Sequence, residues 1–283
     1  MKSADFYCRK LATSHYENFS VASPFVGLER RRDLWRIYAY CRTTDDFGDE
    51  HDLTGAGESA ARTARLQRWR EDVAGLFAGA LPIHPVLIAL RDTIERHGLR
   101  AQSFLDLIDA NVQDQHVDSY EDWATLRDYC SRSAAPVGRM VLGVFEVKNP
   151  RAGVLSDDVC IGLQLANFAQ DVSLDTARGR SYLLQHDLRA GGTIAATRAH
   201  CERARGLLAS GIELEHMVPS TLRRQLVLYR FGGLAILDQI TRSGYRTAQR
   251  RPRVSLFAKC ALLLRALCTP ANRATDAAGL EPV

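Results

Sequence analysis

The chain has 283 residues, of which 46% are hydrophobic, 25% charged and 8% aromatic. This mixture excludes a wholly disordered chain, because it supplies ample apolar area for a core. The net charge of +4 is small for this length and cations are mixed with acids, so we expect no nucleic-acid partner. Arginine supplies 33 of the 37 cations, which codon bias explains more simply than a need for bidentate phosphate contacts.

Cysteine usage and the chain ends bear on the compartment. The seven cysteines form no C-x-x-C pair, which argues against a disulfide framework and against a zinc cluster. The first ten residues carry charges and no long apolar run, unlike a signal peptide. The apolar stretch within 255–268 is interrupted by Lys259 and Arg265 and is too short to cross a bilayer. We therefore expect a cytoplasmic protein. A core helix is the first interpretation of that stretch, and contact with the inner membrane face is the alternative.

Long segments rich in Ala, Leu, Arg and Glu predict helices, since their apolar residues recur every three or four positions. Ser156 has the sequence of a helix N-cap, and Pro219 with Ser220 predicts another helix start. Strand-like alternation is nearly absent. The sequence predicts roughly nine or ten helices in one all-α domain over 1–270, followed by a loose tail over 271–283. Turn signals separate the segments at 54–57, 79–85, 148–153, 189–192 and 218–220.

A first acidic stripe lies within 37–52. On a helix at about 100° per residue, Tyr38, Arg42, Asp45 and Asp49 fall within roughly 60° of one another. Such like-charged i,i+4 pairs are unfavourable in an isolated helix, but one or two carboxylates per ion suit Mg²⁺. A solvated acidic helix end is the alternative. We treat the same spacing in Asp114, Asp118 and Asp122 as a decoy that shows how weak this motif is alone.

A second stripe lies within 161–182. Gln164, Asn167, Asp171 and Asp175 share an arc of roughly 80° on a helix whose other residues are mainly apolar or small. A capped helix with a polar outer face would explain Asp175. It would not explain Gln164 and Asn167, because burying their amides without hydrogen-bond partners is unfavourable. Two such helices facing each other across an apolar cavity would hold Mg²⁺ against a diphosphate, with arginines on the remaining oxygens. This arrangement suits ionisation of an allylic diphosphate.

The two stripes resemble the motifs of the squalene/phytoene synthase family. The first is similar through Tyr38-x₃-Arg42-x₂-Asp45-Asp46-x₂-Asp49, and the second through the run from Gln164 to Tyr182. Tyr129-Cys130 with 134–138 resembles the middle motif of the family, and 104–120 and 244–259 resemble neighbouring helices. The resemblance implies the all-α isoprenoid synthase fold, Mg²⁺ dependence, and chemistry on C15 or C20 prenyl diphosphates.

The resemblance also implies roles for individual residues. Metal ligands would be Asp45, Asp49, Asn167 and Asp171, with Asp175 in support, and Tyr129 would lie beside the reacting carbons. Plain core positions are the alternative for the tyrosines. The implied substrate-binding residues are His15, Asn18, Tyr38, Arg42, Gln164, Asp175, Arg180, Tyr182 and Tyr245.

The segment 15–19 and the residues around Asn167 are similar to the bacterial branch that forms hydroxysqualene in squalene and hopanoid biosynthesis. Gln170 stands where many carotenoid-forming relatives have Arg, so a phosphate contact is missing or replaced. Ala169 replaces a common aromatic, which could enlarge the pocket, and Leu184 replaces a usual Pro at a turn. None of these departures removes an implied metal ligand.

The branch implies that presqualene diphosphate ionises with loss of diphosphate, and that water captures the cation without NADPH. The absence of a dinucleotide-binding fingerprint agrees with this, although relatives that use NADPH lack it too. The alternatives are a presqualene diphosphate synthase condensing two farnesyl diphosphates, a phytoene- or dehydrosqualene-type synthase, and a non-catalytic assembly partner. The sequence leaves open transient membrane contact and association with neighbouring pathway enzymes.

Overall fold

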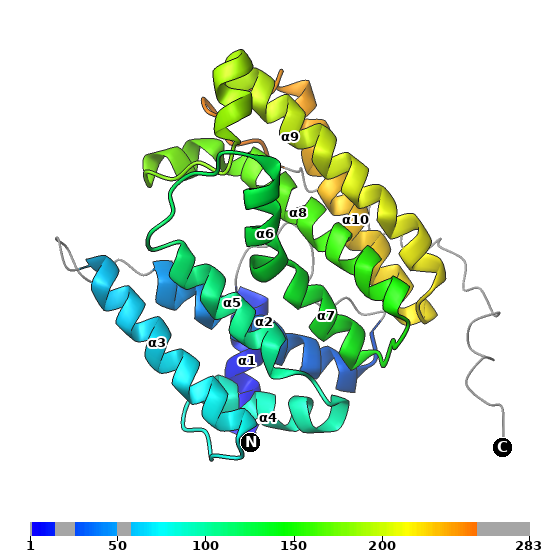
Figure 1. Ribbon diagram of the computed structural model, residues 1–283. Helices are drawn as coiled ribbons and strands as arrows, with labels where there is room; N and C mark the ends of the chain where they lie inside the picture. Colours follow the sequence, from blue (N-terminus) through cyan, green and yellow to red (C-terminus); the bar gives the residue numbers. More distant parts are fainter. Residues whose placement is uncertain (1, 15–25, 50–57, 254–283) are drawn as a thin grey trace.

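Ten α-helices make up the part of the chain that the computed structural model describes, residues 2–14, 26–49 and 58–253 (Figure 1). No strand occurs in these ranges, which confirms the all-α prediction. The predicted tail over 271–283 and the stretch 255–268 lie outside the described residues. The helices are α1 (Lys2–Ser14), α2 (Leu28–Asp49), α3 (Glu58–Phe77), α4 (Pro85–His97), α5 (Ala101–Gln113), α6 (Trp123–Ser133), α7 (Ala135–Val144), α8 (Pro150–Ala177), α9 (Gln185–His216) and α10 (Ser220–Arg242).

Helices α2 and α8, which carry the two acidic stripes, belong to different sides of the bundle. Helix α8 packs against α7, α9 and α10, whereas α2 packs against α1, α3, α4 and α5. Both touch α7, but they do not pack on each other. In Figure 1, α8 accordingly lies among α6, α7 and α10, with α2 on the far side of α5. Because the two helices do not touch, side chains from both can line the space between them.

The start of α8 differs from the prediction. Asn149 is the N-cap, since its side chain accepts a hydrogen bond from the Arg151 amide at 2.9 Å, and Pro150 occupies the first turn. The predicted cap, Ser156, instead lies buried inside the helix. Asparagine followed by proline is the stronger start signal. A Cβ at Gly138 of α7 would lie 2.4 Å from the Ser156 Oγ, so this glycine lets α7 and α8 approach closely.

The predicted helix start at Pro219 and Ser220 agrees with the structure. Helix α10 begins at Ser220 with Pro219 as its N-cap residue. Helix α8 ends at Ala177, and Gly179 then adopts a φ of 75°, which a side chain would disfavour. The turn signal at 189–192 corresponds to a kink within α9, where Gly192 has a φ of 71°. Before the kink, Leu188 of α9 packs against a small buried cluster that includes Val172 of α8.

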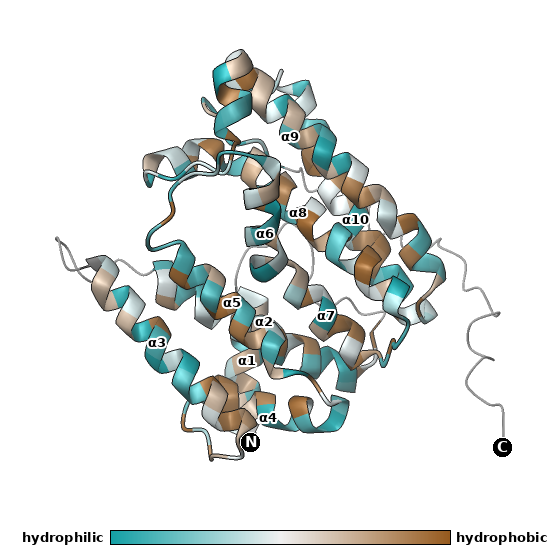
Figure 2. Cartoon of the chain, in the orientation of Figure 1, coloured by the Kyte–Doolittle hydropathy of each residue, from teal (hydrophilic) through white to brown (hydrophobic). Residues whose placement is uncertain are grey.

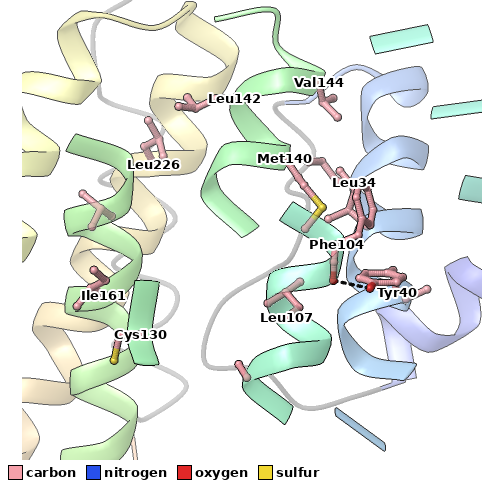
Figure 3. Close-up of a cluster of buried hydrophobic side chains, with 14 of the residues drawn as sticks. Leu34, Tyr40, Phe104, Leu107, Cys130, Met140, Leu142, Val144, Ile161 and Leu226 are labelled. Carbon is pink, nitrogen blue, oxygen red and sulfur yellow. Dashed lines mark hydrogen bonds between the residues drawn. The ribbon is translucent and has the colours of Figure 1, made fainter. Parts of the chain in front are cut away.

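The core lies between the helices rather than in separate layers (Figure 2). Figure 3 shows how α2 contributes Leu34 and Tyr40 to it, with the Tyr40 hydroxyl donating to the Phe104 carbonyl of α5 at 2.8 Å. Tyr40 also stacks on Trp69 of α3, with ring centroids 5.8 Å apart. These contacts fix the register of α2 from its buried face, so its acidic face must point elsewhere.

No helix in the described ranges is long and apolar enough to cross a membrane.

Candidate active site

A polar cavity of about 270 Å³ lies between α2 and α8. Its wall is completed by the end of α5, by α6 and by the segment that joins α8 to α9. Five carboxylates line it, together with three arginines, and those acids are Asp45, Asp49, Asp114, Asp171 and Asp175. Most of the predicted site residues are thus in one place, as the two-stripe interpretation expected.

The first stripe occupies the last turns of α2. Asp45 and Asp49 both face the cavity, and Asp45 accepts a hydrogen bond from the Asn111 amide of α5 at 3.2 Å. A Cβ at Gly48 would lie 2.7 Å from the Asn111 Oδ1, so the glycine allows α5 to approach. Arg42 lines the cavity as well and pairs with Asp46 at 2.6 Å.

The second stripe occupies the last turns of α8. Gln164, Asn167, Asp171 and Asp175 all line the cavity. Asp171 forms a two-point ion pair with Arg251, whose Nη2 lies 3.1 Å from the Asp171 Oδ2. Arg251 lies in the segment after α10, 80 residues along the chain from Asp171.

Two arginines connect the stripes across the cavity. Arg178 and Arg180, just after α8, lie 3.6 Å and 3.4 Å from the carboxylate oxygens of Asp49 on α2. Backbone hydrogen bonds hold this segment against the α5–α6 connection, with Ser181 N donating to Asp118 O at 2.7 Å and Gln185 N to Tyr120 O at 2.9 Å. The cations at the mouth of the cavity are therefore positioned by backbone contacts.

The pKa values of two of the cavity acids, Asp45 and Asp175, are raised above those of ordinary carboxyls. The pKa of Asp45 is raised to about 7, chiefly because the surrounding protein restricts its solvation, although the side chain still reaches cavity water. Restricted solvation, with the Asp171 charge, raises the pKa of Asp175 to about 7. Restricted solvation and the charges of neighbouring acids both disfavour the ionised form of these carboxyls. The cavity is therefore suited to a ligand that brings cations.

A second cavity, of about 290 Å³, begins where the polar one ends. Apolar side chains of α2, α7, α8 and α10 form most of its wall, among them Ile37, Val141 and Leu226. Tyr38 of the first stripe lines this apolar cavity rather than the polar one, and Asn167 lines both. A ligand with a charged head and an apolar chain could therefore span the two cavities at Asn167.

Tyr129 and Tyr182 stand in an aromatic cluster on the polar cavity. Tyr182 stacks on Phe168 of α8 with centroids 3.9 Å apart, and Tyr129 of α6 lies 5.8 Å from Tyr182. Both hydroxyls donate to Asp114, Tyr129 at 2.7 Å and Tyr182 at 3.2 Å. The cluster places aromatic faces and one carboxylate beside the acidic stripes.

Some predicted residues lie elsewhere. Tyr245 lines neither cavity, and its ring lies under the guanidinium of Arg198, 5.1 Å from the carbon to the centroid. Its contact with substrate therefore stays a prediction. His15 and Asn18 lie outside the described residues. Ala169 is fully buried and borders neither cavity, and Leu184 is the N-cap residue of α9, with an extended backbone.

Gln170 has a different partner from the one that an arginine there would have. Its amide, buried beneath the site, donates to the Pro252 carbonyl at 2.8 Å. This bond fixes the residue next to Arg251, which pairs with Asp171. A cation from the chain after α10 therefore reaches the site of a chain that lacks an arginine at position 170.

Sequence reasoning missed several cavity residues, above all Asp114. The triplet 114, 118 and 122 does not share a helix, because α5 ends at Gln113 and Asp122 caps α6. Setting the triplet aside as a decoy was therefore wrong for Asp114, which lines the cavity. Asn111 and Ser133 also line it. The three-residue spacing of Asn111 and Asp114 at the end of an amphipathic helix is a weak signal, because the partners of Asp114 come from α6 and from the segment after α8.

Within the described ranges, no three acidic, His or Cys side chains converge closely enough to hold a metal ion by themselves. The carboxylates instead face one another across the cavity in ones and twos. Such a set fits Mg²⁺, which takes one or two carboxylates and completes its shell with water and phosphate oxygens. It does not fit a closed structural metal site.

An all-α fold that encloses an acid-lined cavity next to an apolar one defines the class of this protein, and comparison with known proteins makes it specific. The family model for squalene/phytoene synthase matches residues 12–258. The chain belongs to the squalene/phytoene synthase family, whose members are synthases and prenyltransferases acting on prenyl diphosphates.

Individual relatives differ in their reactions. The chain is 30% identical to a phytoene synthase of Arthrospira platensis, over 89% of this chain and 88% of that protein. It is 32% identical to a presqualene diphosphate synthase of Rhodopseudomonas palustris, over 63% of this chain and 62% of that one. The crystal structure of squalene synthase HpnC from Alicyclobacillus acidocaldarius is similar with a TM-score of 0.78 and 41% identity, covering 86% and 95% of the two chains.

Proposed function

We propose that this protein converts presqualene diphosphate into hydroxysqualene and diphosphate, with Mg²⁺ and without NADPH. The observation that carries the proposal is the meeting of an acid-lined cavity and an apolar cavity at Asn167. A prenyl diphosphate needs both environments at once, because its head is polyanionic and its chains avoid water. The 41% identity to HpnC, described as a squalene synthase, supports the C30 product class.

The residues that would hold Mg²⁺ are the facing acids of the two stripes. Asp45 and Asp49 would bind from α2, and Asn167, Asp171 and Asp175 from α8. Five carboxylates gather around this one cavity, and they outnumber the three arginines that line it, which supports this assignment. Bound Mg²⁺ would supply Lewis-acid stabilisation of the departing diphosphate.

The other side chains would bind and orient the substrate. Arg42, Arg178 and Arg180 face the same cavity and would neutralise the remaining diphosphate oxygens. Gln164 would donate to the head group, and Tyr38 would contact the chain in the apolar cavity. The stacked rings of Phe168 and Tyr182 would limit access of water to the reacting carbons.

A second candidate is condensation of two farnesyl diphosphates to presqualene diphosphate. The 32% identity to the Rhodopseudomonas palustris enzyme favours it, and the phytoene synthase relative makes a phytoene-type condensation the third candidate. A purely structural role as an assembly partner is opposed by the five acids gathered in one cavity.

Substrate choice separates these candidates in one experiment. The purified protein is incubated with Mg²⁺ and either farnesyl diphosphate or presqualene diphosphate, without NADPH, and products are identified by mass spectrometry. We expect hydroxysqualene from presqualene diphosphate and no C30 product from farnesyl diphosphate alone. Product from farnesyl diphosphate alone would reject the assignment and support the condensation.

A further inference from the structure

Asp114 is the cavity acid that the two stripes leave without a role. It follows the last residue of α5, and its carboxylate accepts hydrogen bonds from the hydroxyls of Tyr129 and Tyr182 at 2.7 and 3.2 Å. These three residues come from three separate elements of the chain, so the arrangement is tertiary. Asp114 lies on the wall of the cavity itself, within reach of water or substrate there.

Among the described residues, the hydrogen-bond partners of the Asp114 carboxylate are phenols rather than a cation. Arg180 donates to the Asp114 backbone carbonyl at 3.0 Å, not to the carboxylate. Burial raises the pKa of Asp114 to about 6, while the Tyr129 hydrogen bond and the charge of Arg180 oppose the rise. Such a carboxylate is ionised at neutral pH yet basic enough to take up a proton, as a general base should be.

Tyr129 can connect this carboxylate to a reacting centre. Its ring is almost fully buried, and it packs 5.2 Å from Tyr120 and 5.8 Å from Tyr182. The neighbouring rings hold its hydroxyl at Asp114, and the residue lines the polar cavity. The electron-rich faces of this cluster would also tolerate a nearby cation.

We propose that Asp114 accepts, through the Tyr129 hydroxyl, the proton that water releases when it captures the substrate cation. This proposal rests on the proposed function. A water oxygen forms a bond to the cationic carbon, and one of its O–H bonds breaks. That proton passes to the Tyr129 oxygen as the Tyr129 proton moves to the Asp114 carboxylate, so one alcohol and one protonated carboxyl result. The rival acceptor is the departing diphosphate.

The relay is tested by counting how often ionisation leads to alcohol. Presqualene diphosphate labelled with ¹⁸O at its bridging oxygen is turned over once with Mg²⁺. Ionisation events are the diphosphate released plus the label scrambled in recovered substrate, which detects cations that return. The variants are Asp114→Asn, Tyr129→Phe and their combination. Asp118→Asn is the matched control, because Asp118 is an exposed acid of the same connection.

We expect Asp114→Asn to lower alcohol per ionisation event about tenfold or more, with Asp118→Asn within about twofold of wild type. Tyr129→Phe should give a similar loss, and the double variant no further loss, because both act in one relay. A merely structural role would lower ionisation and alcohol together. An unchanged ratio in Asp114→Asn and Tyr129→Phe would overturn the relay and favour the diphosphate as acceptor.

The two proposals fail in distinguishable ways. Wild-type protein that neither releases diphosphate from presqualene diphosphate nor scrambles its label refutes the proposed function, and the relay with it. Wild-type protein that forms hydroxysqualene while the variants keep its ratio refutes the relay alone. Should Asp114→Asn unfold, as circular dichroism would reveal, Tyr129→Phe keeps the carboxylate and decides the question.

Discussion

The two halves of helix α2 treat their acids in opposite ways. In the first half, Asp33 is completely buried, and donors from two helices surround it, including Thr93 at 2.8 Å and Arg96 at 3.1 Å. In the last turns, Asp45 faces a cavity, and its hydrogen bond from the described residues comes from one amide, that of Asn111. A carboxylate whose oxygens are surrounded by hydrogen-bond donors stabilises the fold. A carboxylate with few donors around it can still bind a ligand.

The largest expected effect comes from removing one charge at the cavity end. Asp45→Asn or Asp171→Asn should reduce kcat/KM at least about a thousandfold, or ~4 kcal/mol, if each carboxylate binds the metal that assists ionisation. Steady-state kinetics with presqualene diphosphate, the proposed substrate, measures this. Asp157→Asn is the control, since Asp157 lies on α8 like Asp171 but pairs with Arg139 at the surface. Unchanged turnover in Asp45→Asn and Asp171→Asn would refute the metal site.

The same substitution at the buried end should change stability instead. Asp33→Asn removes the buried one of the two carboxylates that Arg36 and Arg96 share, so we expect the free energy of unfolding to fall by about 3 kcal/mol. Urea denaturation measures the loss. Asp92→Asn, at a half-exposed member of the same network, should cost less than about 1 kcal/mol. A large loss of kcat in folded Asp33→Asn protein would contradict the view that the first half of α2 serves stability and its last turns serve the site.

Ligand binding should stabilise the folded protein only through the acids at the cavity end of α2. Mg²⁺ with inorganic diphosphate at about 100 times the dissociation constant should add ~2.7 kcal/mol to the free energy of unfolding, and EDTA should reverse it. Thermal unfolding of wild type, Asp33→Asn and Asp45→Asn makes the comparison. The shift should persist in Asp33→Asn and shrink in Asp45→Asn. Equal shifts in both variants would place the metal elsewhere.

The smallest effect is a pH dependence of stability without metal. The pKa values of Asp45 and Asp175 in the folded protein, about 7, lie above those of unfolded carboxyls. The folded state therefore holds more protons, so this contribution to stability is complete below about pH 4 and is lost as pH rises through 7. The double variant Asp45→Asn/Asp175→Asn should show a shallower decline between pH 5 and 8 in urea titrations. A steeper one would contradict the sign.

The spacing of residues along single helices predicted the helical fold and the two acidic stripes. The features that it missed depend on contacts between residues far apart in the sequence. The stripes on α2 and α8 were visible because i,i+4 spacing is a property of one helix. Asp114 was misjudged because its partners, Tyr129 and Tyr182, lie 15 and 68 residues away. The Arg251 pair with Asp171 spans 80 residues and could not be read from spacing. Ser156 failed as a cap because a neighbouring Asn-Pro start outcompeted it.

The segment between α8 and α9 is held by amide-to-carbonyl bonds to residues 118 to 121. Such bonds do not depend on which side chains those positions carry. Mutations at 118 or 121 can therefore accumulate during evolution without displacing Arg180 or Tyr182, whereas a proline at 181 or 185 would remove a donor and disturb both. The rim of the site is tolerant of side-chain drift but intolerant of backbone change, which makes its exposed positions good places to attach a probe.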